Sequence, residues 1–76
     1  MNKTRRKAIA EIAEQIETLR EELEALQEEE QEYMDNMPEN LQGSERYEVA
    51  EAAVDNLGSA LDSLDEALNY MEEAQQ

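Results

Sequence analysis

Two apolar heptad repeats occupy opposite halves of the chain, and they match each other when one is read in reverse. Both alternate steps of three and four residues, which is the a/d spacing of helices that pack along one seam. The first repeat comprises Ile9, Ile12, Ile16, Leu19, Leu23, Leu26, Glu30 and Tyr33. The second comprises Tyr47, Ala50, Val54, Leu57, Leu61, Leu64, Leu68 and Met71.

A reversal of the chain near residue 40 pairs each position of the first repeat with one of the second. Leu19 then meets Leu61, and Tyr33 meets Tyr47; the residue numbers in every pair sum to 80. The sequence therefore predicts an all-α fold, an antiparallel two-helix coiled-coil hairpin that forms a single domain over residues 1–76.

The helix boundaries follow from capping residues and from one proline. Thr4 and Ser44 are suitable N-caps, so we expect helices over about residues 4–35 and 44–74. Pro38 disfavours helix at the residue before it, which places the turn at residues 36–43.

Charge restricts the partners of this chain. It has 21 acidic and 6 basic residues and a net charge of -15, and from Glu11 onward only Arg20 and Arg46 oppose the carboxylates. Nucleic acid and anionic membranes attract basic surfaces, so we expect neither as a direct partner. The expected partner is a basic protein. High charge with low hydrophobicity also suits disorder, but a disordered tract has no reason to keep a heptad.

Residues that carry catalysis are scarce. The chain has no histidine and no cysteine, which removes most nucleophile–base pairs and soft metal sites. The segment 55–66 superficially resembles a calcium-binding loop, but Leu57 occupies a ligand position. We therefore expect no enzyme activity, no catalytic residue, no cofactor and no metal. Without an 18-residue apolar run, we also expect a cytoplasmic protein.

Glutamates recur every three or four residues on the first helix, on the side away from the seam. They are Glu11, Glu14, Glu17, Glu21, Glu24 and Glu28. Helical rise spaces successive carboxylates about 5 Å apart, comparable with phosphates along a nucleic acid strand. The stripe is either a partner-binding surface or an ordinary solvated face. Arg20 is its single cation, and this scarcity of basic residues favours binding, because an exposed face normally mixes charges.

A second candidate surface is the apolar tip near the turn. It comprises Tyr33, Met34, Met37, Leu41 and Tyr47, which either pack the turn or anchor a partner. On the second helix, Ala53, Ala60, Ala67 and Ala74 widen the apolar stripe beyond a two-helix seam. That width favours a homodimer that forms a four-helix bundle.

The remaining charged residues have expected structural roles. In the antiparallel register Arg20 lies opposite Asp65, and Arg46 lies opposite Glu29. The basic cluster, which should lie beside the acidic end of the second helix at Glu72 and Glu73, comprises Lys3, Arg5, Arg6 and Lys7. Glu30, the polar core position, should reach Arg46, a tyrosine hydroxyl or water. Gly58 should pack closely against Arg20 or Gln27, or else contact a partner.

The turn sequence 35–47, between an acidic leucine-rich helix and an Ala/Leu/Asp helix, resembles small acidic helical-hairpin orphan proteins of phages and mobile elements of Gram-positive bacteria. In size and acidity the chain is also similar to phage-encoded anti-restriction and anti-CRISPR proteins. The likeness to anti-restriction and anti-CRISPR proteins implies an inhibitor of a basic nucleic-acid-handling protein that acts by nucleic-acid mimicry. The alternatives are a structural or adaptor coiled coil, acting by self-association or partner docking, and a chaperone of basic proteins.

Overall fold

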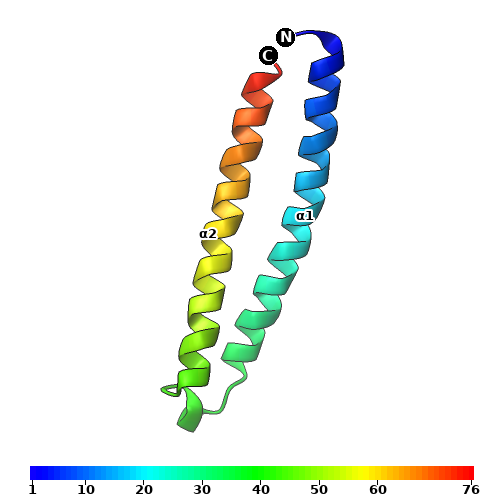
Figure 1. Ribbon diagram of the computed structural model, residues 1–76. Coiled ribbons are helices and arrows are strands. Elements are labelled where there is room, and N and C mark those ends of the chain that lie inside the picture. Colours follow the sequence, from blue (N-terminus) through cyan, green and yellow to red (C-terminus); the bar gives the residue numbers. More distant parts are fainter.

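The computed structural model describes residues 1–76 and confirms the predicted helical hairpin (Figure 1). Helix α1 spans Lys3–Asp35, the short 3-10 helix η1 spans Glu39–Leu41, and α2 spans Glu45–Ala74. The two long helices run antiparallel, so both termini lie at the end opposite the turn. The Cα atoms fill a rod of 59 × 15 × 12 Å. Neither helix contains an apolar stretch long enough to cross a membrane.

Side-chain caps set where the two helices begin. The Asn2 side chain accepts a hydrogen bond from the backbone N–H of Arg5 at 2.8 Å, so α1 begins at Lys3 and its cap is Asn2, not Thr4 as expected. Ser44 caps α2 as expected, because its hydroxyl oxygen accepts from the N–H of Tyr47 at 3.3 Å.

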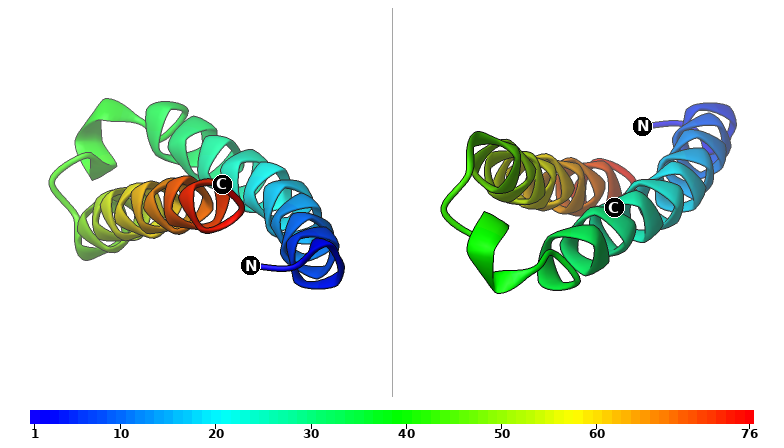
Figure 2. Two further views of the ribbon diagram at one scale, coloured as in Figure 1. Left: turned by 90° about the horizontal axis from the view of Figure 1, so that it is seen from above. Right: turned by 90° about the horizontal axis from the view of Figure 1, so that it is seen from below.

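The helices wind about each other, as the end-on views in Figure 2 show, and only four residues are buried. Ala50 and Leu61 lie in the centre of the α2 surface that faces α1. Met34 and Met37 are buried where the chain leaves α1, so the turn is packed by its own methionines. A core this small makes the hairpin marginal as a fold.

The seam on α1 differs from the predicted one. Ile12, Leu19, Leu26 and Tyr33 form one row of the expected a/d repeat, yet they are 50%, 59%, 55% and 47% exposed. The other row turns inward, with Ile9, Ile16, Leu23 and Glu30 half-buried. In half of the predicted a/d pairs, therefore, the residue from α1 is exposed to solvent and does not pack in the seam.

Polar contacts between the helices account for this rotation of α1. Arg20 and Gln27 each come directly after an exposed leucine, Leu19 or Leu26. They therefore form a neighbouring row, about 100° around the helix from the exposed row. Arg20 bonds Asp65 on α2, and the Gln27 amide donates to the carbonyl oxygen of Val54 at 3.1 Å. These bonds draw their own row into the interface and turn the neighbouring leucines outward.

Gly58 permits the close approach of Gln27, as the sequence suggested. A Cβ atom at Gly58 would lie 3.1 Å from Nε2 of Gln27, the far end of a flexible side chain. Gly58→Ala should therefore stabilise the hairpin by up to about 1 kcal/mol, since alanine favours a helix interior and Gln27 can shift slightly. Urea denaturation followed by circular dichroism measures this change. A loss of stability would show that the bond from Gln27 to Val54 cannot adjust.

Candidate functional site

Carboxylates from both helices gather on one side of the hairpin, which we call the acidic face. On α1 they are the six predicted glutamates, all exposed except the half-buried Glu24. The second helix adds exposed carboxylates that were not predicted as part of the site: Glu51, Asp55, Asp62, Glu66, Glu72 and Glu73.

Helical geometry places most of these groups on one side, and Glu11, Glu66 and Glu73 point outward at its edge. The Arg20 side chain points to α2. Around the axis of α1, Glu17 and Glu24 lie about 60° and 40° from Arg20 in one direction. Leu19 lies about 100° from Arg20 in the opposite direction. The two helices contribute to the same side, because Glu17 of α1 and Glu72 of α2 line one groove. The acidic face and the exposed leucine row are therefore on opposite sides of the hairpin.

The density of negative charge on this face is close to that of a nucleic acid strand. Its twelve carboxylates lie over residues 11–28 of α1 and 51–73 of α2. The longer of these segments spans about 33 Å by helical rise, which gives about one carboxylate per 3 Å. One strand of duplex DNA carries a phosphate every 3.4 Å or so along the helix axis.

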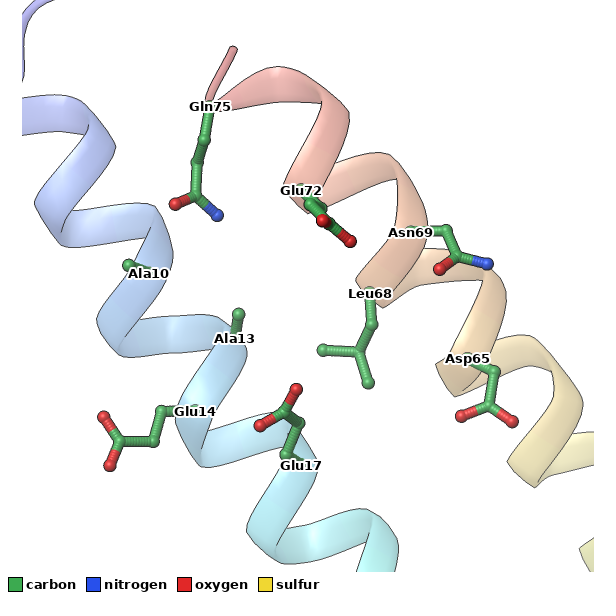
Figure 3. A pocket seen from close by; sticks show the side chains of 9 residues that line it. All are labelled: Ala10, Ala13, Glu14, Glu17, Asp65, Leu68, Asn69, Glu72 and Gln75. Carbon is green, nitrogen blue, oxygen red and sulfur yellow. The ribbon is translucent and has the colours of Figure 1, made fainter.

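A groove of about 840 Å³ opens between the helices near the termini, on the acidic face. Figure 3 shows Glu17, Leu68 and Gln75 directed into the space between the helices, with Glu72 at its α2 edge. Small Ala10 and Ala13 form the α1 wall, and the groove is open because they fill little of it. The carboxylates of Glu17 and Glu72, which line it, suit a cationic side chain of a partner.

No protein-family model, curated protein or solved structure matches this chain. The structure also contains no group of three or more histidine, cysteine, aspartate or glutamate side chains that could hold a metal ion.

Arg20 is the one basic residue within the acidic face that bonds carboxylates. Its guanidinium donates to Asp65 at 2.5 and 3.0 Å and to Glu24 at 2.6 Å. The expected pair with Asp65 is thus confirmed. The bond from Arg20 lowers the pKa of Asp65, and the bond to Asp65 raises the pKa of Arg20 further above its usual range.

The effect of this pair should depend on pH. Because the pKa of Asp65 is lower in the folded chain than its ordinary value of 3.8, the pair stabilises folding above that value and loses its effect as pH falls through the folded pKa. At pH 7 the variant Asp65→Asn should melt at a lower temperature than the native chain. The gap should close in acid, as thermal melts at pH 7 and below pH 3 would show. A gap of equal size at both would exclude the ion pair as its cause.

The other basic residues make no ion pairs, since both salt bridges in the structure belong to Arg20. Arg46 does not reach Glu29 as expected. It lines a hollow of about 600 Å³ near the turn, with Glu30, Tyr33 and Val49. The basic cluster at the start of α1 is likewise exposed and unpaired with Glu72 and Glu73, contrary to expectation.

The residues of the predicted apolar tip do not share one environment. Met34 and Met37 are buried in the turn, and Tyr47 is half-buried. Tyr33 and Leu41 remain exposed. Of this group, therefore, only the two exposed side chains are accessible to a partner.

Proposed function

We propose that this chain is a cytoplasmic acidic protein-binding module that occupies the nucleic-acid-binding surface of a basic protein. The observation that carries the proposal is the convergence of carboxylates from both helices on one face of an elongated rod. A stripe on a single helix could be a solvated surface, whereas the aligned stripes of two helices form a broad anionic surface. Such a surface complements the potential of a groove that binds phosphates.

The resemblance in size and acidity to phage-encoded anti-restriction and anti-CRISPR proteins supports a narrower form of this proposal. In that form the module is an inhibitor that acts by nucleic-acid mimicry, and its target is a nucleic-acid-handling protein of host defence. The net charge of -15 supports attraction to such a target, and the acidic face, with the groove at Glu17 and Glu72, supplies the contact surface.

The experiment compares two charge-reversed variants of equal net charge. The first variant replaces Glu17 and Glu21 of the acidic face with lysine. The second variant replaces Glu22 and Glu29, on the outer edge of α1, with lysine. The native chain, immobilised, captures its target from host lysate at low salt, and titration then gives each variant's affinity. We expect the first variant to lose at least tenfold in affinity and the second less than threefold.

Competition with duplex DNA or RNA tests the mimicry itself. If the acidic face occupies the nucleic-acid site, a saturating oligonucleotide must displace the chain from its target. Simultaneous binding of both would exclude mimicry, and equal losses in the two charge-reversed variants would show that only total charge matters.

A structural or adaptor coiled coil is the second candidate function. The exposed row of Ile12, Leu19, Leu26 and Tyr33 favours it, because these side chains keep a heptad on a surface that the hairpin itself does not cover.

A further inference from the structure

The exposed row on α1 is one half of a broader apolar surface, which we call the apolar face. On α2, Val49 and the alanines Ala53, Ala60 and Ala67 extend the inward-facing stripe to one side. Tyr33 and Val49 line the same hollow near the turn, so the extensions of the two helices lie on the same side of the hairpin. This side is opposite the acidic face.

The hairpin exposes more surface than its mass requires. Its accessible area is 5820 Å² for a mass of 8.7 kDa. A compact folded protein of that mass exposes about 4,700 Å² by the usual scaling. The excess of about 1,100 Å² is slightly more than the 800 Å² or so that one partner contributes to a stable interface of standard size.

We propose that the apolar face binds a second copy of this chain, end over end, to form an antiparallel four-helix bundle. In this arrangement α1 lies against α1 of the second copy and α2 against its α2. A two-fold axis crosses the apolar face between Leu19 and Leu26.

The rows on both helices are self-complementary about this axis. On α1 the row is centred between residues 22 and 23, so Leu19 meets Leu26 of the second copy and Ile12 meets its Tyr33. On α2 the alanine row is centred on Ala60. Small side chains there let the two α2 helices approach closely.

The two centres coincide in the folded hairpin. Interhelical contacts join Gln27 to Val54 and Arg20 to Asp65. The numbers of two residues that lie opposite each other in the hairpin therefore add up to between 81 and 85. The position of the α1 centre, between residues 22 and 23, and the number of Ala60 add up to between 82 and 83, which is within this range. The two centres therefore lie opposite each other. Two rows on different helices thus share a single axis, as a symmetric dimer requires.

Charge selects the end-over-end arrangement. The basic cluster lies at the open end of the rod, and Arg5 continues the exposed row of α1 by one seven-residue step beyond Ile12. The turn end, residues 28–51, carries nine carboxylates against a single arginine, Arg46. Reversing the second copy brings each basic end to an acidic turn, including Glu30 and Glu45 of the hollow. The other two-fold arrangement would place the two basic clusters together.

Two adjacent glutamate substitutions test the interface. Leu26 lies in the apolar face, and Ala25 is exposed on the outer side of α1. By sedimentation equilibrium we expect the native chain and Ala25→Glu to have about twice the mass of 8.7 kDa, and Leu26→Glu to be monomeric. A monomeric native chain, or a dimeric Leu26→Glu, would overturn the proposal. If Leu26→Glu instead unfolds, a melting temperature that rises with native protein concentration supports it, and a constant one overturns it.

A spin label at the open end tests the polarity. The chain has no cysteine, so Thr4→Cys gives a unique attachment point. Position 4 is about 28 Å from the axis by helical rise, so the end-over-end dimer places two labels about 55 Å apart. Pulsed electron paramagnetic resonance measures that distance. A separation near 20 Å would show that the open ends lie together, and the absence of any intermolecular distance would show that no second copy binds the apolar face; either result would overturn the proposal.

Discussion

Leu61→Ala is expected to unfold much of the hairpin, whereas Leu19→Ala should barely affect the isolated molecule. The heptad pattern pairs these two leucines as equals, but Leu61 is 5% exposed and Leu19 is 59% exposed. Truncating a buried leucine costs about 2–5 kcal/mol. A chain of this length has a total stability of about 4–11 kcal/mol, and a core of four residues places it toward the lower end.

The measurement needs a monomeric background, because the proposed dimer would bury Leu19. Urea denaturation of Leu19→Ala and Leu61→Ala, each combined with Leu26→Glu, isolates the hairpin. There we expect Leu19→Ala to cost no more than about 0.5 kcal/mol, the usual range for an exposed site. In the native background the same change should weaken association. Equal costs in the monomer would mean that the seam is the symmetric a/d seam that the sequence predicted.

The comparison of these leucines shows what the heptads could predict. Apolar spacing determined that two helices pack antiparallel, and the structure confirms that hairpin. Spacing could not determine which of two apolar rows faces inward, because both satisfy the same repeat. The choice depends on polar bonds made by Arg20 and Gln27, of which the one from Gln27 relies on the missing side chain at Gly58. The Arg20 pair was foreseeable from register; its effect on the rotation of α1 was not.

The acidic face was predicted in part for a related reason. The six glutamates of α1 were recognised because their spacing on one helix is visible in the sequence. The carboxylates of α2 recur in steps of four and seven residues, from Glu51 and Asp55 to Glu73, which is also a regular pattern. Their position beside the α1 stripe follows only from how the helices are rotated against each other. Treating each helix alone therefore found half of the surface.

The apolar and acidic faces do not compete for the same side chains. A second copy on the apolar face would leave the acidic faces of both copies on the outside of the bundle. Dimerisation would therefore double the anionic surface available to a basic partner and hold it on a four-helix support, which is more rigid than a lone hairpin.

Salt should act in opposite directions on the two proposed interactions. Each copy carries a net charge of -15, so two copies repel each other, and the few contacts of the basic ends cannot cancel that repulsion. Raising ionic strength from about 0.01 M to 1 M shortens the screening length from roughly 30 Å to 3 Å. The dimer, which depends on apolar burial, should therefore tighten severalfold in sodium chloride. Binding to a basic partner depends on charge attraction and should weaken by about a hundredfold or more.

Sedimentation of the chain alone and titration with its captured target, in one series of sodium chloride concentrations, compare both trends directly. The Leu26→Glu variant separates them further, because its affinity for the partner should still fall with salt although it cannot dimerise. A dimer that dissociates as salt rises would mean that ion pairs, not the leucine row, hold the copies together. Partner affinity that is constant across the series would exclude the acidic face as the binding surface, since opposed charges at an exposed interface cannot escape screening.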